Sequence, residues 1–182
     1  LQGVRRAAMA VHLEIHFAYL MLASDMQAVR GLPGLAHRLG VHAAVVSTLD
    51  YIAEPGLEAE AFMPHEAAKL ARAAVVLSEA EAAAKRLGVA FHWSLPRPDA
   101  SGTGCRENIA RSLYVAADGS VSPCVYVNVP VDRLDPERRV FGNVNATDPL
   151  EIWESAFRRF RDGLAGGAPD LPCRTCPKRY MI

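Results

Sequence analysis

The four cysteines are the residues of this chain whose type and spacing are best suited to chemistry. Cys105 and Cys124 flank a predicted β-hairpin, and Cys173 and Cys176 form a C-x-x-C pair. A predicted helix with clear start and stop signals lies between the two pairs. Thiolates are soft ligands, and four of them can hold one metal centre. The spacing therefore predicts a metal site within residues 105–176.

Three other uses of four thiols compete with an iron–sulfur cluster. Disulfides need an oxidising compartment, of which the sequence gives no sign. Unrelated buried thiols are disfavoured because the two thiols of a C-x-x-C pair are usually used together. Zinc accepts four thiolates, but it usually takes them from two knuckles, and only one pair here is a knuckle. A cluster accepts ligands from separated loops, and Cys176-Pro177 resembles the end of ferredoxin motifs. Spacing alone leaves cluster and zinc equally open.

The composition is that of an ordinary globular protein. The chain has 182 residues, of which 51% are hydrophobic and 22% charged, and Lys+Arg and Asp+Glu both total 20. This balance gives no indication of nucleic acid or an anionic membrane as a partner. The longest apolar stretch, 15–23, is too short to span a bilayer, and the start lacks signal-peptide features. We expect a cytoplasmic chain that is the later part of a longer protein.

The elements before residue 96 alternate between strand and helix. Strands are predicted over 11–23, 42–49 and 89–95, with helices over 25–39 and 64–87 between them. Asp25 is a candidate N-cap of the first helix, and Gly40 and Gly88 are candidate C-caps. The predicted apolar stripe of the second helix consists of Leu70, Ala73, Leu77, Ala80, Ala84 and Leu87. The order β-α-β-α-β predicts an α/β fold with a parallel sheet.

The composition changes at Pro96, and residues 96–104 read as a linker. Beyond it, Asp118-Gly119 predicts a two-residue hairpin turn. Asp148, Pro149 and Glu151 predict the start of a single helix that ends at Gly166-Gly167. The predicted buried face of this helix comprises Trp153, Ala156, Phe157, Phe160 and Leu164, and its predicted solvated face comprises Arg158, Arg159 and Arg161.

Several motifs in this half resemble those of one family in their order. The spacing C-x13-G-x4-C runs from Cys105 through Gly119 to Cys124. The other motifs are DGSVSPC (118–124), FGNV (141–144), DPLEIWES (148–155), FRRFR (157–161) and CRTC (173–176). Together they resemble the SPASM domain, the auxiliary iron–sulfur domain at the C-terminus of many radical S-adenosylmethionine enzymes.

The earlier half resembles the last βα units of the partial TIM-like barrel in those enzymes. The resemblance implies three segments: the end of a barrel over 1–95, a linker over 96–104, and a small α+β SPASM-like domain over 105–182 with a hairpin and one helix. In such a barrel His12, Glu14 and His16 would face the lumen, as would Ser47 at the end of the second strand. There they would lie near S-adenosylmethionine or substrate.

Two departures from the family pattern narrow what the resemblance implies. The chain has no C-x-x-x-C-x-x-C, the motif that binds the catalytic cluster, so we expect this motif upstream in the parent protein. The third cysteine position of the full SPASM pattern is Ile182. In the seven-cysteine family the two halves of this set serve different clusters. That all four converge here, so that Cys105, Cys124, Cys173 and Cys176 hold one auxiliary 4Fe-4S cluster, is therefore our own inference.

By resemblance, the parent protein is a radical S-adenosylmethionine enzyme that modifies a peptide, a protein or a small molecule. Such enzymes receive electrons from a donor such as flavodoxin or ferredoxin. The alternative is a non-catalytic module that binds zinc or an iron–sulfur cluster, including a degenerate partner protein without a catalytic cluster. We expect neither nucleic acid nor a membrane among the partners.

Overall fold

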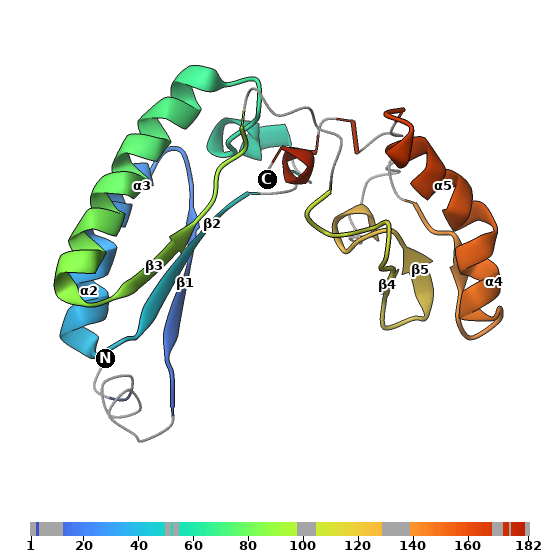
Figure 1. Cartoon of the computed structure of the whole chain (residues 1–182), viewed down its shortest axis with the longest axis horizontal. Coiled ribbons are helices and arrows are strands. Elements are labelled where there is room, and N and C mark those ends of the chain that lie inside the picture. Colours follow the sequence, from blue (N-terminus) through green and yellow to red (C-terminus); the bar gives the residue numbers. More distant parts are fainter. Residues whose placement is uncertain are drawn as a thin grey trace. The chain divides into compact units, whose positions relative to one another are not determined.

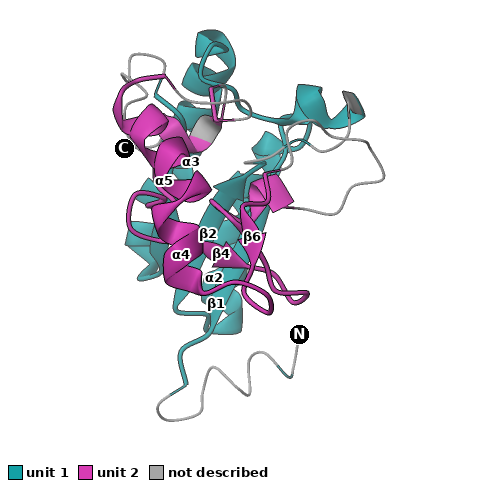
Figure 2. Ribbon diagram, turned by 90° about the vertical axis from the view of Figure 1, so that its right-hand side faces the viewer, with its two compact units in different colours: residues 1–98 teal, residues 99–182 magenta. Residues whose placement is uncertain are grey.

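The computed structural model divides the chain into two compact units, Leu1–Pro98 (unit 1) and Asp99–Ile182 (unit 2) (Figure 2). Each unit has its own hydrophobic core. The residues that the structure describes are 3, 13–49, 52, 55–97, 105–128, 139–168, 173–174 and 176–180. Most of the predicted linker, 98–104, lies outside them.

Unit 1 is built on a three-stranded parallel sheet (Figure 1). Its strands are β1 (His16–Met21), β2 (Ala43–Thr48) and β3 (Ala90–Trp93), in that order across the sheet. The register pairs His16 with Ala43, and Ala43 with Ala90. The predicted parallel α/β arrangement is confirmed within this unit, although β1 is shorter than the predicted 11–23.

The first helical segment differs from the single helix predicted over 25–39. A 3-10 helix, η1 (Met26–Gly31), precedes the α-helix α2 (Leu32–Leu39). Asp25 occupies the N-cap position but makes no cap bond, and its carboxylate instead accepts a hydrogen bond from the Tyr19 hydroxyl at 3.3 Å. Gly40 ends α2 with φ +68°, which is the left-handed C-cap expected of glycine.

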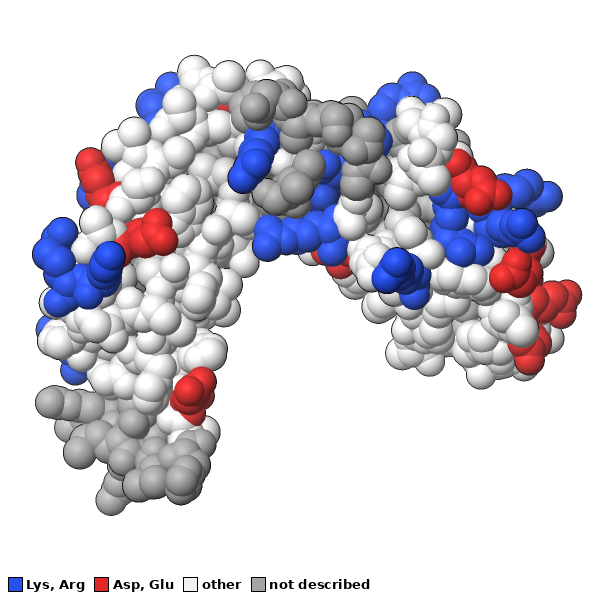
Figure 3. All heavy atoms as spheres, in the orientation of Figure 1, with Lys and Arg blue, Asp and Glu red and all other residues white. Residues whose placement is uncertain are grey.

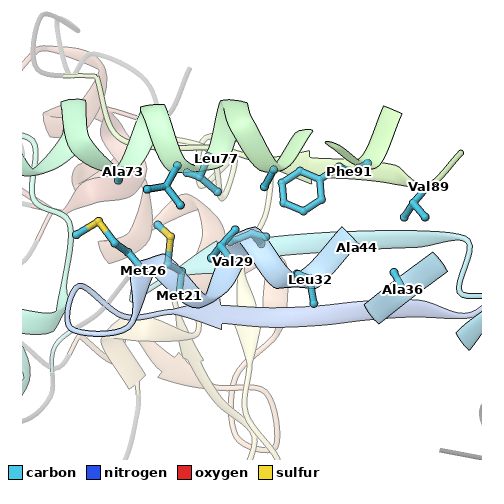
Figure 4. Packing of buried hydrophobic residues seen from close by; sticks show 14 of the residues in the cluster. Met21, Met26, Val29, Leu32, Ala36, Ala44, Ala73, Leu77, Val89 and Phe91 are labelled. Atoms are coloured by element: carbon cyan, nitrogen blue, oxygen red, sulfur yellow. The ribbon is translucent and has the colours of Figure 1, made fainter. Parts of the chain in front are cut away.

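The long helix α3 (Ala67–Leu87) follows the 3-10 helix η2 (Pro55–Glu60) and packs with α2 on the sheet (Figure 1). Its side chains Ala73 and Leu77 point toward Met21 and Val29, which are fully buried (Figure 4). The predicted stripe is buried except for Leu87, which is half-buried. Within the described residues, no helix combines the length and the hydropathy needed to cross a membrane.

Unit 2 contains a small antiparallel sheet. Its strands are β4 (Tyr114–Val115), β5 (Ser120–Ser122) and β6 (Gly142–Asn143). The β4–β5 turn has three residues rather than the predicted two, because the backbone pairing closes between Ala116 and Ser120. Gly119 is the residue with positive φ, at +82°, as is typical of a type I turn that ends in a bulge.

The single helix predicted after Asp148 is in fact two helices. They are α4 (Pro149–Glu154) and α5 (Ala156–Ala165), and the backbone breaks at Ser155, where φ is −101° and ψ is −111°. Asp148 caps α4 as predicted, since its carboxylate accepts the Leu150 N–H at 2.7 Å. Basic and acidic side chains lie close together over this part of unit 2 (Figure 3), as in the Arg158–Glu154 pair at 3.4 Å.

Candidate metal centre

Cys105 begins the first cysteine segment of unit 2. Its carbonyl accepts the Asn108 N–H at 3.0 Å, which closes a turn in which Asn108 has φ +53°. This turn directs the Ile109 side chain into the core, and Ile109 is only 2% exposed. A buried anchor next to a tight turn fixes the position of the thiol.

Cys124 lies just after β5 and before the 3-10 helix η3 (Tyr126–Asn128). The backbone N–H groups of Val127 and Tyr126 donate hydrogen bonds to its sulfur. The Ser122 hydroxyl donates to the Cys124 carbonyl at 3.0 Å. This thiol is therefore held from both sides, and N–H donors aimed at a cysteine sulfur are a usual feature of iron–sulfur sites.

Cys173 and Cys176 form the third segment. The Cys176 N–H donates to the Cys173 carbonyl at 3.4 Å, and the 3-10 helix η4 (Pro177–Arg179) follows at once. The Arg179 N–H donates to the Cys176 carbonyl at 3.2 Å. Cys173 and Cys176 are therefore joined through the backbone, and a short helix holds the Cys176 end.

Lys178 connects the three cysteine segments. Its carbonyl accepts the Arg106 N–H at 3.2 Å, and its ammonium lies 3.5 Å from the Glu107 carboxylate. The same ammonium lies 5.6 Å from the centre of the Tyr126 ring, two residues after Cys124. Since its side chain is only 15% exposed, these contacts are partly shielded from solvent. No sequence pattern indicates this role of Lys178, because the role depends on contacts between segments more than 50 positions apart.

The cysteines also share apolar support. Cys105, Cys124 and Cys173 all pack against one cluster, which consists of Ile109, Phe157, Phe160 and Leu164. Helix α5 supplies three of these four side chains, so the thiols pack against its apolar face. All four cysteines are free thiols and half-buried.

Burial and mutual repulsion disfavour the thiolate forms. Burial, with the Cys105 thiolate and Glu107 as lesser causes, raises the pKa of Cys124 even though two N–H donors oppose the shift. Burial, followed by the thiolates of the other three cysteines, raises the pKa of Cys173 to about 12. The Cys173 thiolate is therefore repelled electrostatically by all three other thiolates. Four such sulfurs become stable as thiolates when a cation lies among them, and this donor set fits an iron–sulfur cluster.

The described residues do not form a closed site for a single ion. Among them, no three His, Cys, Asp or Glu side chains are arranged so that they could hold one metal ion together. The assignment of the four cysteines as ligands of one centre therefore stays a prediction.

The residues predicted to line a lumen lie on the sheet face opposite the helices, with His12 outside the described residues. Glu14 and His16 are both exposed, with 3.5 Å between their side chains. Ser47 is exposed at the other end of the β1–β2 pair, opposite Leu20. The alternation of β3 also exposes His92, which the sequence analysis did not single out. The structure thus brings Glu14 and His16 together but not Ser47 with them.

Two arginines of unit 2 are less exposed than the other arginines near them in the sequence. Arg161 was predicted to be solvated, but its guanidinium lies 3.7 Å from the centre of the Trp153 ring and donates to the Trp153 carbonyl at 2.9 Å. Arg179, which the sequence analysis did not consider, is 7% exposed. Arg158 and Arg159 are exposed as predicted.

Part of unit 2 matches a known protein family. No curated protein matches the chain. Residues 105–177 match the family model of the SPASM iron–sulfur cluster-binding domain, which covers all four cysteines, the small sheet and both helices of unit 2. By this match, the part of unit 2 that holds the thiols resembles a SPASM domain and is suited to iron–sulfur binding.

Proposed function

We propose that unit 2 binds one auxiliary 4Fe-4S cluster through Cys105, Cys124, Cys173 and Cys176, within a radical S-adenosylmethionine enzyme. The observation that carries the proposal is the packing of Cys105, Cys124 and Cys173 against one apolar cluster, with Cys176 joined to Cys173 by a backbone hydrogen bond. The family match over 105–177 favours iron over zinc as the bound metal.

In this function the surrounding residues position the thiolates and shield them from solvent. Lys178 holds the three cysteine segments together, and the apolar face of α5 shields one side of the thiols from water. The N–H groups of Val127 and Tyr126 stabilise negative charge on the Cys124 sulfur. When bound, the cluster would supply a one-electron carrier or a substrate anchor.

For unit 1 we propose the role of the last βα units of a partial TIM-like barrel. The parallel order of β1, β2 and β3 is consistent with such a barrel. His12, Glu14, His16 and Ser47 would then face S-adenosylmethionine and a peptide, protein or small-molecule substrate. An electron donor such as flavodoxin or ferredoxin would reduce the enzyme in the cytoplasm.

The metal content of the anaerobically purified chain tests the cluster. We expect about four irons and four acid-labile sulfides per chain. Cys176→Ser should lose most of the iron, whereas the control Arg174→Ala, an exposed residue inside the same C-x-x-C, should keep it. One zinc per chain without sulfide would overturn the proposal and favour a structural module.

The enzymatic part has a separate test in the sequence of the parent protein. A C-x-x-x-C-x-x-C upstream of residue 1 would support a radical S-adenosylmethionine enzyme. A complete parent sequence without this motif would overturn the enzymatic role and leave the cluster-binding role intact.

A further inference from the structure

Arg179 is a buried cation in the last cysteine segment. It is 7% exposed and lies three residues after Cys176, whose carbonyl accepts its backbone N–H at 3.2 Å. Because a buried guanidinium loses its hydration, it is stable only near a compensating negative charge. The fold fixes this charge beside the C-x-x-C.

The Nε atom of Arg179 is a donor without an acceptor. It is buried and has no hydrogen-bond partner among the residues that the structure describes. Arg161 Nε shares this state, but the Arg161 guanidinium stacks on Trp153 and bonds to its carbonyl. Buried donors are nearly always satisfied in native proteins, so an unsatisfied one beside a metal-ligand segment indicates a missing acceptor.

The charge of Arg179 acts on Cys173. It stabilises the Cys173 thiolate and so opposes burial and the other sulfurs, which raise the pKa of this thiol. Arg174, inside the C-x-x-C itself, is exposed to solvent. Solvent screens the charge of an exposed side chain. Arg174 should therefore act more weakly on the cysteines than the buried Arg179 does.

We propose that Arg179 is a positioning residue that donates a hydrogen bond from Nε to an inorganic sulfide of the bound cluster and raises the reduction potential of that cluster. The inference rests on the proposed cluster. An electron taken from a chemical reductant makes the cluster and its thiolates more negative by one charge. A fixed cation and an N–H donor both favour that reduced form.

A redox titration of the full chain, loaded with iron and sulfide and reduced with dithionite under anaerobic conditions, measures this effect. The fraction of reduced cluster is followed by electron paramagnetic resonance. At a fixed potential, Arg179→Gln should lower the ratio of reduced to oxidised cluster by about tenfold, a shift of about 59 mV for one electron. The control Arg174→Gln should leave the ratio nearly unchanged, because it removes the same charge from an exposed position.

Arg179→Lys separates charge from hydrogen bonding, since lysine keeps the charge but lacks the planar fork. We expect a smaller decrease in the ratio than for Arg179→Gln. If the glutamine variant does not retain its iron, the lysine variant decides, and a wild-type midpoint in it overturns the inference. Loss of iron from both variants also overturns it, because Arg179 would then assemble the site rather than adjust its potential.

Two further results would contradict the proposal. A wild-type midpoint in Arg179→Gln with full iron content would show that Arg179 does not act on the cluster. Equal shifts in Arg179→Gln and Arg174→Gln would show a general effect of net charge. Failure of the proposed function is distinct from both, because the wild-type chain would then contain no iron and sulfide.

Discussion

Phe157→Ala should strongly destabilise unit 2 and leave unit 1 unaffected. Phe157 is fully buried beneath the cysteine segments, and its ring centre lies 5.3 Å from that of Phe141, 5.2 Å from that of Trp153 and 6.2 Å from that of Phe160. Truncation of a buried phenylalanine costs about 3–5 kcal/mol. A domain of this size is stable by about 4–12 kcal/mol, at roughly 0.05–0.15 kcal/mol per residue. The substitution therefore removes between a quarter and all of the stability of unit 2.

Hydrogen exchange followed by mass spectrometry reports the two units separately. In Phe157→Ala, amides of 105–128 and 139–168 should exchange much faster, and the four thiols should react more quickly with iodoacetamide. The matched control is Phe62→Ala, which truncates a fully buried phenylalanine of unit 1 and should accelerate exchange there instead. Unchanged protection of unit 2 in Phe157→Ala, or equal loss in both units, would refute this reasoning.

Three further substitutions have local consequences. Gly119→Ala should lower the free energy of unfolding, measured by urea denaturation, by more than about 1 kcal/mol, because φ is +82° and a Cβ would lie 2.6 Å from a neighbouring side-chain oxygen. Gly31→Ala, at φ −80° in open space, should not lower it. Arg161→Ala should cost about 1–2 kcal/mol and change the tryptophan fluorescence, whereas Arg159→Ala should stay within about 0.5 kcal/mol. In metal-free protein the pKa of Cys173 in the folded state is about 12, above its ordinary value of 9.0. The contribution of this thiol to the stability of the folded state is therefore complete below pH 9.0 and is lost as pH rises toward 12. The urea midpoint should therefore fall as pH is raised from 7 to 10.5. It should fall less in Cys173→Ser than in wild type.

Elements with local signals could be predicted from the sequence. Gly40 and Gly88 end α2 and α3 because both adopt positive φ, which only the local backbone requires. Asp148 caps α4 for a similarly local reason. The parallel order of the sheet follows from the alternation of strands and helices along the chain.

Features that depend on tertiary contacts could not be predicted in the same way. The break at Ser155 interrupts a periodic apolar pattern that continues through it. Strand β6 has two residues, too few for a periodicity to be seen. Arg161 reads as solvated in a basic run, and its stacking on Trp153 depends on the angle between α4 and α5. For the candidate site, the sequence identified the four thiols, but not the contacts of Lys178 or the burial of Arg179.

The connection that Lys178 makes between the cysteine segments has a consequence for the order of events during synthesis. The sheet of unit 1 is complete once residue 93 has been made, so this unit can fold while translation continues. Cys105 and Cys124 must wait until residues 173–178 have left the ribosome before their segments can be joined. The proposed cluster can therefore be bound by all four thiols only after Cys176 has been made, and a chain that terminates before Cys173 carries two thiols without the partners that would hold them in place.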